Sequence, residues 1–413
     1  MDCFDVVIVG AGPAGGEAAR RLSNAGFKIL LAEKESSFAA NDFSSGGAPL
    51  EILSDFDLPR SAVGAFCHQI KITTSHDAHR WQGREAVALV LDFQKLRSFL
   101  ADETTRNGSA VRLGWAYRQH ETKAGRTRVH FKPTGQETLE TIETRVLIDA
   151  TGSERRVLMG GQNTNNRRRT IVGRGIEYLI EVPKPVYQAY ADCLSFYIGA
   201  KWMPQGYAWI FPMKNPRLKI GVGRNYPAEQ VVPHARSMKY YLDQLIRECL
   251  KCDPLRILDK HGKTIVYTRH QRDLYAHQNI IAVGDAVSTV NPLTFEGIRH
   301  ALKSGEIAAR HTQAFLEEKK TAFQGYATEM RRYCGLKWVT SEILTEKTYR
   351  EPDDDKMTMM LHALKNLPLA AFKNLFFDYS FKSAVRFYAD YQWRVFKRAL
   401  GLGRKSTLSR GRE

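Results

Sequence analysis

The pattern of apolar and polar positions near the start of the chain predicts a strand, a helix and a second strand. Residues 4–9, FDVVIV, form a continuous apolar run rich in β-branched residues, which is typical of a buried parallel strand. A helical pattern follows in residues 14–26, and residues 28–33, KILLAE, form another short apolar run. This order predicts the first unit of a parallel α/β sheet.

Two later segments have the same strand-like character. Residues 146–157 contain an apolar run that ends in Asp149 and is followed by Gly152. Residues 279–309 contain an apolar run that leads into Gly284, then a loop, and then a clear helical pattern. Both segments predict a strand whose carboxyl end carries glycine and acidic residues.

The stretches between these segments show short strands separated by proline and glycine turns. They occupy residues 66–91 and 170–270. One of them, KWMPQGYAWIFPMKN, has rings at alternate positions, so Tyr207, Trp209 and Phe211 should project from one face of a strand. Such a face either packs in a core or lines a ligand cavity, and the pattern leaves both interpretations open.

The glycines between the first strand and the helix have the spacing of a dinucleotide-binding turn. Gly10 permits a tight turn, Gly12 lets the backbone approach a pyrophosphate, and Gly15 allows close helix–strand packing. The start of the helix, at Ala14, presents free N–H groups and a positive dipole end to the phosphates. Glu33 ends the second strand, where it can accept hydrogen bonds from a ribose.

The segment 279–309 favours FAD over a nicotinamide cofactor. Asp285 suits a hydrogen bond to the ribityl chain of a flavin. The helix that begins near Gly297 and Ile298 would direct its positive end at the flavin ring and stabilise the charge of a reduced flavin. The sequence has no second strand–GxGxxG–helix unit, so an external reductant, such as NADPH or a reduced ferredoxin, would bind transiently or be another protein.

In this order, the pieces resemble the flavoprotein class that includes aromatic hydroxylases, geranylgeranyl reductases and flavin halogenases. The resemblance implies an α/β fold with a discontinuous Rossmann-type FAD-binding domain, an inserted antiparallel-sheet substrate domain and a helical C-terminal region. The predicted ranges are 1–65, 86–165 and 271–325 for the FAD-binding domain, 66–85 and 166–270 for the substrate domain, and 326–413 for the C-terminal region. The predicted FAD-binding residues are Gly10, Gly12, Ala14, Gly15, Glu33, Gly152, Gly284, Asp285, Pro292, Gly297 and Ile298.

The segment PQGYAWIFP matches the PxxYxWxFP element of the geranylgeranyl reductase family at every fixed position. By that resemblance, Tyr207, Trp209 and Phe211 line a cavity over the isoalloxazine ring and hold an isoprenoid chain whose C=C bonds are reduced. Apolar walls suit such a substrate, because burial contributes roughly 25 cal/mol per Å². Reduction also requires a proton, for which the Tyr207 hydroxyl and an ordered water are both candidate donors.

Three positions depart from the family pattern. Asp92-Phe93 stands where the family usually has Asp-Arg, so the usual arginine contact to the cofactor is missing there. Phe295 stands where the family usually has glycine. The loop Ser44-Ser45-Gly46-Gly47 lacks the cysteine that archaeal members tend to carry, although its glycines allow a close approach to the flavin.

A halogenase is an alternative, because YAWIFP is also close to the WxWxIP signature of flavin-dependent halogenases. Lys71 would then be the halogen-carrying lysine, but only its position supports this, and a solvated strand residue is the simpler interpretation. Three further alternatives stay open at this point: a monooxygenase acting on an aromatic substrate, a membrane-associated FAD electron carrier, and non-redox cyclisation on reduced flavin.

Composition adds a large positive charge. The 413 residues include 61 Lys and Arg against 44 Asp and Glu, a net charge of +17. Residues 382–412 contain nine of these cations and one acid, interleaved with aromatic residues, which is typical of a helix on an anionic membrane surface. A helix packed on the domain is the alternative, and nucleic acid is the partner that this pattern favours least.

The remaining sequence features bear on location and metals. The amino terminus lacks a signal-peptide pattern, and no apolar run approaches the roughly 18 residues that span a bilayer. We therefore expect a cytoplasmic protein with peripheral membrane contact. Cys249 and Cys252 form an isolated CxxC without further ligands at usable spacing, so no metal site is predicted.

Overall fold

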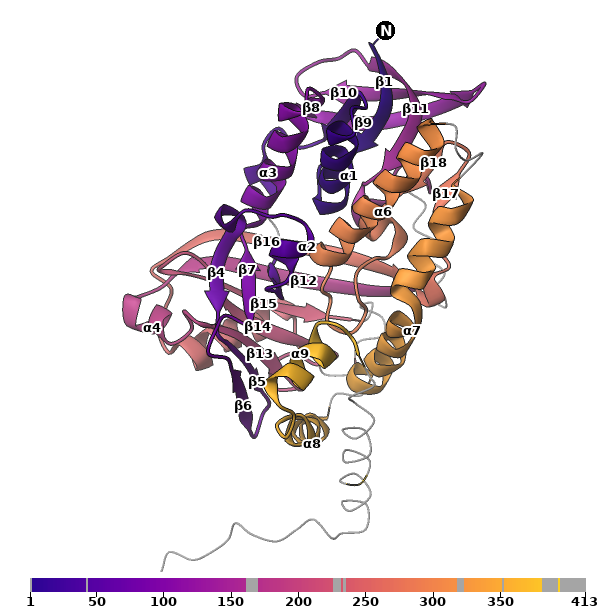
Figure 1. Cartoon of the computed structure of the whole chain (residues 1–413). Coiled ribbons are helices and arrows are strands. Elements are labelled where there is room, and N and C mark those ends of the chain that lie inside the picture. Colours follow the sequence, from indigo (N-terminus) through magenta and orange to yellow (C-terminus); the bar gives the residue numbers. More distant parts are fainter. Residues whose placement is uncertain are drawn as a thin grey trace, which may run out of the picture.

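A computed structural model describes residues 2–41, 44–160, 170–225, 232, 235–317, 323–350, 353–380 and 393 of the chain. These residues form three sheets, with helices packed on the two larger ones (Figure 1). In the part of the chain so described, no helix has both the length and the hydropathy to cross a membrane.

The first sheet has eight strands and includes the predicted parallel unit. Its path runs β17-β18-β11-β1-β2-β8, and β9 and β10 extend it through β11. Neighbours from β18 to β8 are parallel, as the apolar runs predicted. The strand bounds are β1 (Asp2–Val9), β2 (Ile29–Glu33), β8 (Ala110–Leu113), β9 (Trp115–Lys123), β10 (Arg126–Pro133), β11 (Glu140–Asp149), β17 (Ala276–His277) and β18 (Ile280–Ala282).

Helices cover one face of this sheet and the β9–β10 hairpin covers the other. The helices α1 (Pro13–Asn24), α3 (Phe93–Arg106) and α6 (Ile298–Leu316) lie side by side, with α1 in the middle. Apolar residues of α1 and α6 share one core with β1, while Val129 and Phe131 of β10 share another with the opposite face of β1. Coverage of both faces explains why the strands are continuously apolar.

The second sheet has seven strands in the order β16-β12-β15-β14-β13-β5-β6. All neighbours are antiparallel except β13 and β5, which are parallel. The α/β fold with an antiparallel second sheet is thus confirmed, apart from that one pair. The strand bounds are β5 (Gln69–Thr73), β6 (Ala78–Gln82), β12 (Thr170–Glu181), β13 (Cys193–Ile198), β14 (Gly206–Pro212), β15 (Arg217–Arg224) and β16 (Arg256–Thr268).

A third sheet has only three strands. Its strands are, in spatial order, β3 (Gly47–Pro49), β7 (Ala88–Leu91) and β4 (Val63–Cys67). The short helix α2 (Ile52–Asp55) lies between β3 and β4 in the chain. The stretch 66–91 therefore divides between two sheets, because β5 and β6 join the seven-stranded sheet. The predicted domain boundaries stay a prediction.

Helices cover both faces of the seven-stranded sheet. On one face, α4 (Lys184–Gln188) and α5 (Met238–Leu245) share a core with Ala208 and Ile210. On the other, α8 (Asp354–Leu364) and α9 (Leu369–Phe376) share a core with Trp209 and Phe211. The alternate residues of β14 therefore face opposite ways, as the strand pattern predicted.

The C-terminal region is helical up to the last described segment. It contains α7 (Gln324–Tyr349), α8 and α9. The side chain of Asp353 accepts a hydrogen bond from the backbone N–H of Lys356 at 3.0 Å and so caps the amino terminus of α8. The predicted basic helix at 382–412 lies outside the described residues, apart from Trp393.

Candidate functional site

The turn between β1 and α1 is packed so closely that only glycine fits at two positions. A Cβ on Gly15 would lie 2.0 Å from the carbonyl oxygen of Gly10, and a Cβ on Gly10 would lie 2.3 Å from that of Ala150. Gly10 also has φ +107°, which disfavours other residues. At Gly12, by contrast, a Cβ would meet nothing within 4 Å. The turn thus leaves space beside Gly12, directly before the amino terminus of α1, where an anionic phosphate group can bind.

Glu33 is held at the end of β2 by contacts with this turn. Its carboxylate accepts a hydrogen bond from the N–H of Ala11 at 2.9 Å and lies 3.3 Å from a guanidinium nitrogen of Arg97. Arg97, from α3, also donates to the carbonyl oxygen of Ala11 at 3.0 Å, and its guanidinium lies over the Phe93 ring. An arginine one helical turn beyond position 93 thus fixes Glu33 and the glycine turn, although position 93 itself carries phenylalanine. The helical pattern alone did not reveal this.

Asp285 lies at the carboxyl end of β18, on a short 3₁₀ turn over Gly284–Val287. Its Oδ1 atom is buried and has no hydrogen-bond partner among the described residues. Burial raises the pKa of this carboxyl group, and the positive charges of Lys263 and Arg155, with a hydrogen bond from the Val290 backbone, only partly offset the effect. A buried acceptor without a partner points to a ligand that donates to it.

A cavity of about 180 Å³ joins these features to the second sheet. Its lining includes Pro13 at the start of α1, Asp285 on the turn after β18, and Gly297 and Ile298 at the start of α6. Phe93 lines the same cavity, at the position where the family usually has arginine. We call it the larger cavity.

These residues fit FAD. The glycine turn and the α1 amino terminus would hold the pyrophosphate, Glu33 the ribose, and Asp285 the ribityl chain, with the flavin ring towards α6. Among the other predicted residues, Ala14 and Gly284 pack against each other, since a Cβ on Gly284 would lie 2.9 Å from that of Ala14. Gly152 follows β11 with φ +64°, whereas Pro292 is buried and lies outside the lining of the larger cavity.

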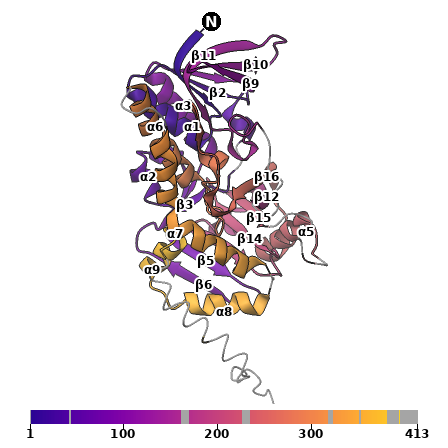
Figure 2. The same cartoon turned by 90° about the vertical axis from the view of Figure 1, so that its right-hand side faces the viewer.

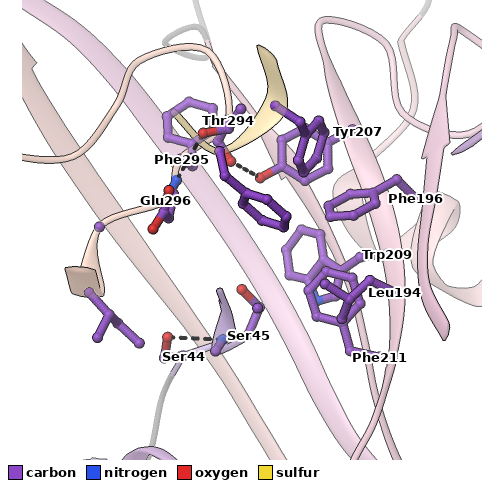
Figure 3. Close-up of a pocket in the computed structure, with 16 residues that line it drawn as sticks. Ser44, Ser45, Leu194, Phe196, Tyr207, Trp209, Phe211, Thr294, Phe295 and Glu296 are labelled. Atoms are coloured by element: carbon purple, nitrogen blue, oxygen red, sulfur yellow. Dashed lines mark hydrogen bonds between the residues drawn. The ribbon is translucent and has the colours of Figure 1, made fainter. Parts of the chain in front are cut away.

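The rings of Tyr207, Trp209 and Phe211 lie on one side of a second, aromatic cavity (Figure 3). The Tyr207 hydroxyl donates to the carbonyl oxygen of Thr294 at 2.5 Å, and the Trp209 indole N–H donates to the buried Glu177 carboxylate at 2.6 Å. Burial, and then the nearby Tyr349, raise the pKa of Tyr207. The rings both pack in a core and line a cavity, so the two interpretations of the sequence are not exclusive.

The aromatic cavity measures about 60 Å³ and opens onto the larger one, because Ser44, Ser45, Tyr207, Trp209, Phe295, Gly297 and Ile298 line both. Phe376 and Phe377, at the end of α9, complete its wall. The sequence did not indicate this contribution, because nothing in the pattern of the C-terminal helices shows which sheet they cover. Lys71 lies on β5 and lines neither cavity.

Phe295 adopts a backbone conformation that favours glycine, with φ +56°. The family glycine at this position therefore has a conformational reason, and the phenylalanine adds a ring that lines both cavities. In Figure 3 this ring faces Tyr207 and Phe196 across the aromatic cavity. Strain of this kind is usually maintained only where the surrounding structure enforces it.

A polar network holds the loop that carries Phe295. The Thr294 hydroxyl lies 2.9 Å from the Tyr379 hydroxyl, which donates to Glu296 at 2.8 Å, and Arg299 donates to the same carboxylate at 2.9 Å. Burial alone would raise the pKa of Glu296, but the neighbouring His300 and Arg299 outweigh it and lower the pKa to about 2. Glu296 is therefore a carboxylate at neutral pH.

Known proteins are similar to both halves of the chain. Residues 180–264 match the model of the geranylgeranyl reductase catalytic domain, and residues 4–178 match that of the pyridine nucleotide-disulphide oxidoreductases. A digeranylgeranylglycerophospholipid reductase of Haloferax volcanii is 27% identical over 410 residues, which cover 91% of this chain and 96% of that protein. The match runs through both sheets and the C-terminal helices.

Solved structures share the fold. A geranylgeranyl bacteriochlorophyll reductase-like protein from Thermoplasma acidophilum has a TM-score of 0.78 at 21% identity, over 97% of this chain and 100% of its own. The myxobacterial chondrochloren halogenase is more distant, with a TM-score of 0.65 at 14% identity, over 95% of this chain and 97% of its own. By these matches, this chain is an FAD-dependent oxidoreductase that is similar to the geranylgeranyl reductases along most of its length.

Proposed function

We propose that this enzyme uses reduced FAD to reduce C=C bonds of an isoprenoid or another long apolar substrate. The observation that carries the proposal is the aromatic cavity, which opens onto the larger cavity through Tyr207, Trp209 and Phe295. The names of relatives support the substrate class, since they include digeranylgeranylglycerophospholipid reductase and geranylgeranyl diphosphate reductase.

In this proposal, the protein excludes water and positions the alkene. Leu194, Phe196 and the three rings of β14 offer apolar contacts along the substrate, and Phe376 and Phe377 complete the wall of the cavity. At about 60 Å³, the aromatic cavity accepts a long chain only if rings around it move. Bound FAD, once reduced by an external donor such as NADPH or a reduced ferredoxin, supplies the hydride.

The proton would come from the Tyr207 hydroxyl or from an ordered water. Tyr207 lines both cavities, and the raised pKa of its hydroxyl keeps that group protonated at neutral pH. Tyr207→Phe separates the two donors. If Tyr207 gives the proton, the rate of alkene reduction should fall by about 100-fold or more; if water does, the rate should change by less than ~5-fold.

The proposed location is peripheral to an anionic membrane, through the basic segment 382–412. An isoprenoid substrate would dissolve in that membrane, so contact with the bilayer would bring the enzyme to its substrate. The charge and aromatic content of the segment support the proposal, while its structure lies outside the described residues.

The test is an anaerobic half-reaction. The flavin of the purified holoprotein is reduced, geranylgeranyl diphosphate or a digeranylgeranyl phospholipid is added, and the flavin absorbance near 450 nm is followed together with product mass. Reoxidation with a gain of two hydrogens per double bond is expected, and a fully saturated analogue should leave the flavin reduced. Reoxidation only with oxygen and an aromatic substrate would contradict the proposal in favour of a monooxygenase or halogenase.

A further inference from the structure

We propose that the outer face of α7 docks on an anionic membrane surface. This α7 face consists of Leu336, Val339 and Ile343 with the exposed cations of the same helix, which are Arg331, Arg332, Lys337 and Lys347. It is separate from the basic segment 382–412, and it stands whether or not that segment binds lipid. It is also independent of which apolar substrate the enzyme reduces.

The apolar residues of the α7 face are unusually exposed. Leu336 is 82% exposed, Ile343 51% and Val339 37%. They follow the kink at Gly335 and are spaced three and four residues apart, so they form one stripe along the helix. In Figure 2, α7 crosses the front of the molecule and no other labelled element lies in front of it.

The charged residues exposed on α7 are all cationic. Among the residues of α7 whose side chains the structure describes, the exposed ones are Thr328, Arg331, Arg332, Leu336, Lys337, Val339, Ile343 and Lys347.

The acids of the same helix are turned inward or held in ion pairs. Glu342 is buried and accepts a hydrogen bond from the Tyr267 hydroxyl at 2.5 Å. Glu346 pairs with Arg269, and Glu329 lies 2.5 Å from a guanidinium nitrogen of Arg310. An apolar stripe flanked by Lys and Arg, without exposed acids, is the pattern of a helix that lies on an anionic lipid surface.

Charge favours a membrane over the other occupants that could cover an apolar stripe. A second copy of the chain, related by a two-fold axis, would bring the cations of the α7 face against the same cations. The chain's own segment 382–412 carries nine cations against one acid, so the α7 face would repel it. An anionic lipid surface complements both the apolar stripe and the positive charge.

The buried side of α7 contacts the loop that lines the aromatic cavity. The Trp338 indole N–H donates to the carbonyl oxygen of Val290 at 3.2 Å, and the Asn291 amide donates to the Ser341 hydroxyl at 3.0 Å. One helix, about 10 Å across, therefore separates the proposed lipid surface from the loop 290–296. Docking through the α7 face would place the bilayer close to the site where an apolar substrate is needed.

The test is the partition of the full-length holoprotein onto lipid vesicles. Vesicles of phosphatidylcholine with phosphatidylglycerol are compared with vesicles of phosphatidylcholine alone, by co-sedimentation. Leu336→Glu/Ile343→Glu should lower the partition coefficient on the anionic vesicles by on the order of 10-fold. The matched control is Leu139→Glu/Leu274→Glu, since both residues are exposed and the added charge is the same. This control should change the coefficient by less than ~2-fold.

Loss of bound flavin would reveal that Leu336→Glu/Ile343→Glu is misfolded. A second variant covers that case. Arg332→Glu/Lys337→Glu changes only exposed cations and should also lower binding by on the order of 10-fold. Equal binding of the variants and the control would overturn the proposal, as would wild-type protein that binds neither kind of vesicle. Wild-type dimers in sedimentation velocity that become monomers in Leu336→Glu/Ile343→Glu would assign the α7 face to a second copy instead, and would equally overturn it.

Discussion

The two large sheets contribute different parts of the protein to the two halves of the proposed site: one contributes mainly backbone, the other mainly aromatic side chains. At the edge of the eight-stranded sheet, the site is mostly backbone, packed so closely that a Cβ on Gly15 would lie 2.0 Å from a carbonyl oxygen. On the seven-stranded sheet, the site is made of rings, and distant residues anchor two of them: Thr294 binds Tyr207 and Glu177 binds Trp209.

This difference predicts two kinds of response to mutation. A site made of backbone has no side chain that can move aside, so a substitution that adds an atom disrupts it. Glycine also has no side chain that a substitution could shorten. A site made of anchored rings adjusts to changes in volume but depends on polar partners far away in the sequence. Four substitutions test this contrast, from the largest expected effect to the smallest.

Gly15→Ala should have the largest effect. The new methyl group would overlap the carbonyl oxygen of Gly10, which the strand holds in place, and we expect a loss of at least ~3 kcal/mol in unfolding free energy. Gly12→Ala is the control, since its methyl group meets nothing within 4 Å. It should leave the stability of the apoprotein within ~0.5 kcal/mol and yet weaken FAD binding. Denaturant unfolding measures the stability of the two apoproteins, and FAD titration measures their affinity for the cofactor. Equal stability of Gly15→Ala and Gly12→Ala would contradict the prediction.

Glu296→Gln should cost nearly as much on the other side of the site. The pKa of Glu296 is about 2 rather than its usual 4.5, because His300 and Arg299 outweigh the effect of burial. The carboxylate therefore contributes about 3 kcal/mol above pH 4.5, and this contribution is lost as the pH falls towards 2. The variant should be less stable than wild type at pH 7, and the gap should close in acid. Unfolding midpoints across that range measure it, and a gap independent of pH would contradict the assignment.

Asp285→Asn should affect binding and stability in opposite directions. The loss of a charged acceptor should weaken FAD binding by about 10- to 100-fold. Burial raises the pKa of Asp285, so its ionised form destabilises the folded apoprotein at neutral pH, and stability should rise as the pH falls towards the usual range of this group. The amide removes that penalty, and the apoprotein should unfold at a higher denaturant concentration at pH 7. A less stable apoprotein would contradict this and show that the hydrogen bond from the Val290 backbone to Asp285 outweighs the cost of burying the carboxylate.

Tyr207→Phe should have the smallest effect on stability. It removes one hydrogen bond to a backbone carbonyl and keeps the ring, so we expect a loss of about 1 kcal/mol. FAD content should be unchanged, because the variant keeps the ring that lines the larger cavity. A loss of bound flavin in this variant would contradict this expectation. It would show that flavin binding depends on the hydrogen bond between Tyr207 and Thr294.

Local patterns were sufficient for elements whose role depends on near neighbours. The glycine turn, Glu33 and the start of α6 at Ile298 follow from spacing within one strand–turn–helix unit. Arg97 and the α9 residues Phe376 and Phe377 were missed, because their importance depends on which distant residues they contact. A single sequence does not record such pairings.

The sequence by itself determined the two kinds of sheet, the position of the glycine turn and the direction in which the β14 rings project. These properties follow from backbone geometry and side-chain periodicity, which act over a few residues. Only the tertiary structure decided that the C-terminal helices close the aromatic cavity, that Phe295 occupies a strained backbone conformation between two cavities, and that α7 exposes an apolar and cationic face. Those properties depend on packing between segments up to hundreds of residues apart, where many arrangements satisfy the same local pattern.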